Sequence, residues 1–168
     1  KANGEVERYV QTVQGQVRTL KTAIESRYKM KIGETHNVLP WLIMYAAMLI
    51  NNAAWDKMGR PHTKEEEENL SKEDTEFGES IWYLKPGSAG KDKLDERWGD
   101  GVYLGIIEES SELYIGTKEG IIKARTFARR GEEDRWRKKE IAEMIGVPWG
   151  PVPGRGMKEV RSKVYIAG

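Results

Sequence analysis

Apolar residues in the first part of the chain recur at helical spacing. Their positions alternate steps of four and three residues, which places them on one stripe of an amphipathic helix: Val6, Val10, Val13, Val17, Leu20 and Ile24. We predict a helix that begins near Glu5, with Asn3 or Gly4 as its N-cap, and that ends before Gly33.

A second helix is predicted over residues 39 to about 55, with Pro40 in its first turn, where the missing N–H costs nothing. This segment is apolar on nearly every side, so it belongs in a core or in a subunit interface. We therefore expect self-association through residues 39–55. The apolar run is shorter than the ~20 residues of a membrane helix, and we expect no membrane span.

The pattern changes after an acidic linker at residues 59–76, which has almost no apolar side chains. Short alternating runs separated by Gly and Pro turns predict strands at 80–84, 102–107, 113–117 and 121–126. One predicted turn is the Gly99-Asp100-Gly101 run, and the clearest hairpin joins Thr117 to Ile121. Several short strands at this spacing are typical of a small barrel or sandwich. The basic stretch 128–146 then predicts a short helix ended by Gly146 and Pro148.

The amino-acid composition excludes several kinds of functional site. The 168 residues include no Cys, which excludes disulfides, thiol nucleophiles and Cys-based zinc sites. Two His residues, His36 and His62, are too few for a zinc cage, and we expect them at the surface or in helix caps. The net charge of +1 is the sum of +4 over residues 1–60, −9 over 61–120 and +6 over 121–168. Basic ends allow a polyanion to bind there, while the acidic middle either repels it or pairs with cations of the same chain.

A polar stripe runs beside the apolar stripe of the first helix, again at steps of four and three: Glu7, Gln11, Gln14, Arg18 and Lys21. A carboxylate can hold a divalent cation, and amide or cationic side chains can follow a phosphate backbone. The alternative is an ordinary solvated helix face whose carboxylate is favoured by the helix dipole.

A second group of cations follows the predicted strands, with Phe127 and Trp136 interleaved: Arg125, Arg129, Arg130, Arg135, Arg137, Lys138 and Lys139. These side chains could neutralise phosphates and stack on bases. The alternative is a charged helix whose field is partly cancelled by Glu132, Glu133 and Asp134.

Five aromatic residues of the predicted strand region are expected to be barrel core, with a peptide or methyl-lysine reader as the alternative: Trp82, Tyr83, Trp98, Tyr103 and Tyr114.

Several short sequence motifs of the chain resemble motifs of a known protein family. Asn3-Gly4-Glu5-Val6-Glu7-Arg8 resembles the block around the last acidic residue of integrases from retroviruses and, more closely, from Copia-like retrotransposons. Further along, FGESIWYLKP (77–86), GVYLGI (101–106) and GIIKARTF (120–127) are similar to the SH3-like barrel that follows the catalytic core in these polyproteins. The resemblance spans about residues 3–130.

The resemblance implies an α+β fold in four parts. Residues 1–58 would be a helical pair left from a ribonuclease H-like core, and 59–76 a linker. Residues 77–130 would be a small antiparallel SH3-like β-barrel, and 131–168 a short basic helix and tail.

The implied activity is Mg²⁺-dependent processing and joining of DNA strands, with Glu7 as the catalytic and metal-binding residue. The two Asp residues that complete the family's triad would precede Lys1, so we expect this chain alone to be inactive. The implied partners are DNA and the upstream part of the same polyprotein, and the implied location is intracellular and nuclear. Two alternatives stay open: a non-catalytic module that binds nucleic acid or protein, and a structural helical scaffold.

Overall fold

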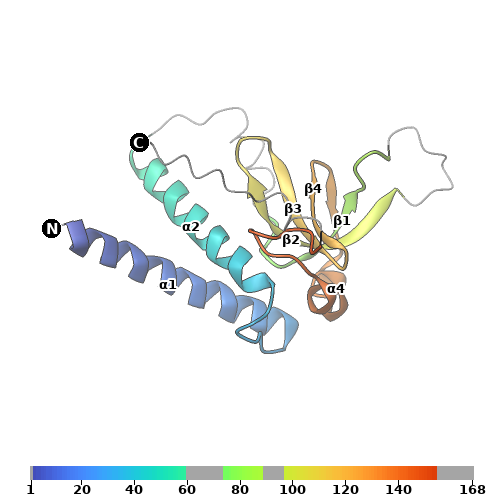
Figure 1. Ribbon diagram of the computed structural model, residues 1–168, viewed down its shortest axis with the longest axis horizontal. Coiled ribbons are helices and arrows are strands. Elements are labelled where there is room, and N and C mark those ends of the chain that lie inside the picture. The colour runs from blue at the N-terminus through green and yellow to red at the C-terminus, as the bar shows by residue number, and fades with distance from the viewer. Residues whose placement is uncertain (1, 60–73, 89–96, 155–168) are drawn as a thin grey trace.

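A computed structural model describes residues 2–59, 74–88 and 97–154 of the chain (Figure 1). The fold is α+β, as predicted: two long helices precede an antiparallel sheet, and a short helix follows it. The elements are α1 (Ala2–Tyr28), α2 (Val38–Lys57), β1 (Ser80–Leu84), β2 (Trp98–Ile107), β3 (Glu112–Thr117), β4 (Gly120–Ala124), β5 (Phe127–Arg129), the 3₁₀ turn η1 (Glu132–Asp134) and α4 (Lys138–Glu143). The predicted linker, His62 and the end of the tail lie largely or wholly outside the described ranges.

Helix α1 is covered unevenly along its length. Val6 and Val10 are 62% and 45% exposed, whereas Ile24, four turns further on, is buried. The apolar stripe therefore exists, but only its C-terminal half packs against the rest of the protein. The N-cap prediction at Asn3 or Gly4 is wrong, because the helix already includes Ala2.

Helix α2 begins one residue before the predicted segment and ends two residues after it, with Pro40 in its first turn. The side chain of His36 caps it: the N–H of Val38 donates to His36 Nδ1 at 3.0 Å. Burial lowers the pKa of His36, against a smaller opposing effect of its hydrogen bond to the backbone of Ile141. The helix is long and apolar enough to count as a candidate membrane span by length and composition. Part of its surface is packed inside the protein, including Trp41, whose indole N–H donates to the carbonyl of Gly146.

The five strands form one open antiparallel sheet in the order β4-β3-β2-β1-β5. All four predicted strands are present, and the hairpin between Thr117 and Gly120 is confirmed. The predicted turn at Gly99–Gly101 is wrong, because these residues lie inside β2 and pair with β1. Both glycines permit close packing: a Cβ on Gly99 would lie 2.7 Å from the Tyr83 ring, and one on Gly101 would lie 2.3 Å from Ile115.

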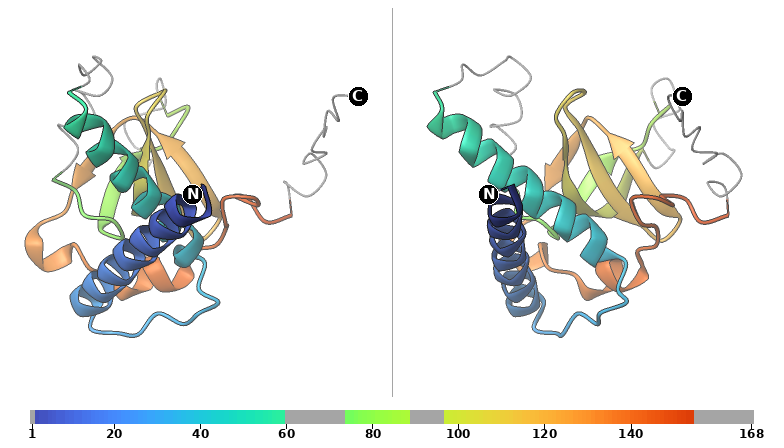
Figure 2. Two further views of the ribbon diagram at one scale, coloured as in Figure 1. Left: turned by 90° about the vertical axis from the view of Figure 1, so that its left-hand side faces the viewer. Right: turned by 60° about the vertical axis from the view of Figure 1, so that its left-hand side comes forward.

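Figure 2 shows the curved sheet with the long helices on one side of it. Both faces of the sheet bury apolar side chains. One face meets the helices, and its core joins residues of α1, α2, the sheet and α4, among them Ile24, Leu42, Val102 and Ile141. The other face has its own cluster: Ile81, Tyr83, Tyr103, Leu113, Ile115 and Ala124. The sheet thus links a helical layer on one side with a separate apolar cluster on the other.

The short helix predicted within 128–146 is present as α4, but it covers only Lys138–Glu143, because η1 comes before it and a non-helical segment separates the two. Backbone groups of that segment form hydrogen bonds with β1 instead of with a helix. The N–H of Ser80 donates to the carbonyl of Arg135 at 2.7 Å, and the N–H of Arg137 donates to Ser80 Oγ at 3.1 Å. Between them, Trp136 packs edge-on against Tyr28, with ring centroids 5.4 Å apart. These contacts with β1 and α1 replace the hydrogen bonds that a continuous helix would need.

Candidate nucleic-acid interface

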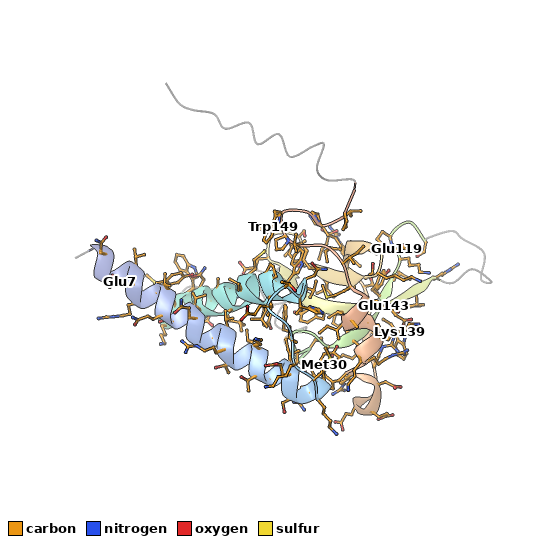
Figure 3. The ribbon with its side chains drawn as sticks, turned by 60° about the horizontal axis from the view of Figure 1, so that its bottom comes forward. Glu7, Met30, Glu119, Lys139, Glu143 and Trp149 are labelled. Carbon is orange, nitrogen blue, oxygen red and sulfur yellow. The ribbon has the colours of Figure 1, made fainter. Side chains whose placement is uncertain are left out.

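The polar stripe of α1 forms a row that faces solvent. Gln11, Gln14 and Arg18 are exposed, and Lys21 is half-buried nearer the core. Arg18 Nε donates to the carbonyl of Gln14 at 3.3 Å, which holds its side chain along the helix. Glu7 is exposed at the free end of α1, away from the sheet (Figure 3). This row offers amide and cationic donors, but it lies on a convex surface.

The described residues do not fit a magnesium site. A divalent cation of this kind needs several oxygen ligands, and two-metal catalysis needs several carboxylates. Glu7 is the single carboxylate of the stripe, and the described part of the chain contains no group of three or more Asp, Glu or His residues able to hold a metal ion. We therefore derive no chemical step through Mg²⁺ from these residues.

The structure places Arg129 in an internal ion pair. Its guanidinium donates to both carboxylate oxygens of Glu79, at 2.8 and 2.7 Å, and the Glu79 side chain is only 1% exposed. The hydrogen bond to Glu79 raises the pKa of Arg129. Arg129 is therefore committed to neutralising a buried carboxylate.

The side chain of Arg130 is also held by contacts within the protein. Its side chain is 3% exposed, pairs with the carboxylate of Asp100, and lies over the Trp82 ring with 4.5 Å to the centroid. Arg135 Nε donates to the carbonyl of Arg130 at 3.0 Å. This cluster joins the strand ends of β1, β2 and β5 rather than presenting cations to solvent.

The other predicted cations remain more accessible. Arg137 pairs with Glu140 at 3.1 Å and is 40% exposed, and Arg125 lies 4.0 Å from Glu112 and is 75% exposed. Lys138 and Lys139 on α4 are exposed. The structure thus divides the predicted basic group into two arginines held in ion pairs with Glu79 and Asp100, and cations that a ligand can reach.

A groove of about 550 Å³ lies between α4, the β3–β4 turn and the ends of β1 and β2. Tyr83 and Trp98 both line the groove; Tyr83 is buried, whereas Trp98 is partly exposed. Figure 3 shows Glu119, Lys139 and Glu143 on this side of the molecule. The charged lining residues are Lys85, Lys118, Arg137 and Lys139, with Asp100, Glu119, Glu140 and Glu143.

Internal contacts reduce the acidic character of this groove. Asp100 and Glu140 are paired with Arg130 and Arg137, whereas Lys118 and Lys139 are exposed. Burial and the nearby carboxylates Glu119 and Asp100 raise the pKa of Tyr83.

Lys118 is a groove residue that no sequence pattern indicated, and for Trp98 ligand binding was only the alternative to a place in the core. Trp98 was expected in the core, as was Trp82, but they are 43% and 40% exposed. Tyr83 and Tyr103 are buried as expected. No sequence spacing connects Trp98 with Lys118 or Lys139, because the groove forms only when β2, β3 and α4 pack together.

Comparison with known protein families, with curated proteins and with solved structures finds no match to this chain.

Proposed function

We propose that this chain is the C-terminal part of a retrotransposon-type integrase, and that it binds DNA. The proposal rests on the exposed apolar side chains in the first half of α1. Val6, Tyr9 and Val10 are 62%, 44% and 45% exposed there, beside Glu7 and the polar stripe. Exposed apolar side chains next to a row of polar ones favour a helix whose outer half packs against another polypeptide. The upstream segment of the integrase is the polypeptide that the sequence resemblance implies.

The sheet topology supports the finer assignment to an SH3-like barrel. A four-strand meander, β1 to β4, is followed by β5, which returns to pair with β1. The curved sheet also encloses its own apolar cluster, which suits a small barrel. In this proposal the two helices are the end of a ribonuclease H-like core, and the magnesium-binding Asp residues come from the upstream segment.

DNA binding is assigned to the groove rather than to Arg129 and Arg130. Lys118 and Lys139 would contact phosphates, and Trp98 would stack on an unpaired base or a sugar. Because log affinity falls linearly with log salt concentration, each lost phosphate contact reduces the slope by about 1. We expect Lys118→Glu and Lys139→Glu each to weaken binding of duplex DNA and to flatten the slope by about that amount.

The measurement is fluorescence anisotropy with a labelled duplex over a range of salt concentrations. The matched control is Lys29→Glu, a charge reversal on the exposed loop after α1, which should leave the slope unchanged. An equal effect of all three variants would contradict the groove, and salt-independent binding would contradict phosphate contacts altogether.

Catalysis requires a longer test protein. A chain that carries the upstream segment should join DNA ends in the presence of Mg²⁺, and Glu7→Gln should abolish joining without lowering the melting temperature. Glu5→Gln, on the same exposed turn, is the control. Full activity of the Glu7→Gln protein would remove Glu7 from the mechanism.

The second candidate is a non-catalytic binding module, which the shared core of helices and sheet favours. A chain that buries α1, α2 and α4 against one sheet can fold as a unit of its own. Sedimentation analysis separates the two candidates: a monomer favours the module, whereas self-association through α1 or residues 39–55 of α2 favours the incomplete integrase core.

A further inference from the structure

A small apolar crevice lies on the helical side of the sheet, apart from the groove. It has a volume of about 200 Å³ and is formed by α2, the second half of β2 and the β2–β3 turn. This is below the roughly 300–1,000 Å³ of pockets for drug-sized ligands, so the crevice suits one bulky side chain of a peptide. Its lining consists of Trp41, Met44, Tyr45, Met48, Leu104, Gly105, Ile106, Ile107, Glu108, Glu109 and Tyr114.

A bulge in β2 shapes the floor of the crevice. The register between β2 and β3 shifts between Tyr103 and Ile106, and Gly105 has a φ of +113°. A Cβ on Gly105 would lie 3.1 Å from Tyr45 Cδ2, and the backbone conformation also disfavours a side chain. The bulge therefore lets α2 approach the sheet at Tyr45, while the adjoining edge of the crevice stays open at Met44, which is 44% exposed.

The rim of the crevice is acidic. Glu108 and Glu109 both line it and are exposed at the β2–β3 turn. Within the part of the chain that the structure describes, neither carboxylate takes part in an ion pair. Two adjacent unpaired carboxylates beside an apolar crevice favour an occupant that combines an apolar anchor with a positive charge.

We propose that this crevice docks a basic peptide segment of another protein. One Leu, Met or Phe side chain of the peptide enters between α2 and the sheet, and an adjacent Lys or Arg contacts Glu108 and Glu109. Met44 and Met48 suit such an anchor because unbranched thioether side chains adapt to its shape. The proposal is independent of the integrase assignment.

The negative charge of the rim favours a basic peptide over three other possible occupants of the crevice. Nucleic acid and anionic lipid would be repelled by the carboxylates. A second copy of the chain, docked about a two-fold axis through this patch, would bring Glu108 and Glu109 against the same residues of its partner. A basic peptide is the occupant that gains from the rim.

The test uses the full chain and short fluorescein-labelled peptides with one Leu or Phe between two Lys residues. Two control peptides replace the Lys residues by Glu or the apolar residue by Ser. We expect micromolar binding of the Lys peptide by anisotropy, and much weaker binding of both controls. The double variant Glu108→Lys/Glu109→Lys should bind the Lys peptide about tenfold more weakly and the Glu peptide more tightly.

A matched variant, Glu132→Lys/Glu133→Lys, reverses two exposed carboxylates on η1, away from the crevice, and should leave binding unchanged. Met44→Asp tests the apolar wall and should weaken binding of the Lys peptide. Far-ultraviolet circular dichroism verifies that each variant is folded. The proposal is overturned if no peptide binds, if both charge reversals act equally, or if unlabelled protein competes by self-association at the same site.

Discussion

Tyr28 connects the end of α1 to the segment that enters β1. Its hydroxyl donates to the carbonyl of Gly78 at 2.6 Å and lies 3.4 Å from Ser80 Oγ. Burial raises the pKa of Tyr28 to about 12 from its ordinary value of 10.0; the nearby carboxylates of Glu140 and Glu79 add to the rise, and the Ser80 hydrogen bond opposes it. The folded state therefore favours the neutral phenol.

The sign of the pH dependence follows from this raised pKa. An acid whose pKa is higher in the folded state contributes stability below its unfolded pKa, and that contribution is lost as the pH rises from 10 towards 12. At neutral pH, Tyr28→Phe should cost about 1 kcal/mol through the lost hydrogen bond to Gly78. By pH 11 the wild-type protein should have lost about 1.4 kcal/mol relative to the variant.

Urea denaturation of both proteins at pH 8 and pH 11 measures this difference. Other tyrosines and lysines titrate in both proteins, so their effects cancel in the comparison. A stability gap that stays constant over this range would show that Tyr28 titrates alike in the folded and unfolded states.

Arg129 supplies a second prediction at this scale. Removing it leaves the carboxylate of Glu79 buried without its ion-pair partner, so Arg129→Leu should lower the free energy of unfolding by about 3 kcal/mol. Lys138→Leu, on the exposed face of α4, should change it by less than about 0.5 kcal/mol. Urea denaturation gives both values. Similar values for the two variants would refute the structural role of Arg129.

At the scale of elements, local patterns predict what local physics determines. The short runs between turn residues at β1 and β3, the helical periodicity of α1 and the apolar segment of α2 that begins beside Pro40 mark where these elements lie. The misassigned elements depend on distant contacts. Gly99 and Gly101 look like a turn but are extended because Tyr83 and Ile115 pack against them.

The same reason explains the partial success at the candidate site. The sequence identifies a group of basic residues, but it does not show that two of its arginines form ion pairs within the protein. Arg129 lies 50 positions from its partner Glu79, and Arg130 lies 30 positions from its partner Asp100. It also does not place Trp98 near Lys139. Contacts between residues far apart in sequence carry no local signal.

The two ends of the apolar stripe of α1 should differ in how much they contribute to stability. Ile24 is 2% exposed and packs over Gly78, so Ile24→Ala should cost about 3 kcal/mol of stability. Val10 lies on the same stripe but is 45% exposed, so Val10→Lys should change stability by less than about 0.5 kcal/mol. Urea denaturation measures both changes, and light scattering should show weaker self-association of Val10→Lys. Equal destabilisation would mean that the whole stripe is covered.

At the scale of the molecule, the helices and the sheet share one core. Ile24 and Leu42 from the two long helices lie in the same cluster as Val102 of β2 and Ile141 of α4. Because no element of this cluster buries its apolar face alone, we expect the helices and the sheet to unfold together in a single transition. Far-ultraviolet circular dichroism, dominated by α1 and α2, should give the same midpoint as the fluorescence of the six tryptophans, which include Trp41 and Trp136 in the shared core.

Ile141→Ala makes this expectation sharper. Ile141 is fully buried in α4, far along the chain from the long helices, so its truncation should cost about 3 kcal/mol. If the core is cooperative, the midpoints seen by circular dichroism and by fluorescence should fall together. Lys138→Ala, on the exposed side of the same helix, should move neither midpoint. A variant in which the fluorescence midpoint falls while the helical signal persists would show that α1 and α2 are stable without the sheet and α4, as they would be if the helical pair were a separate domain.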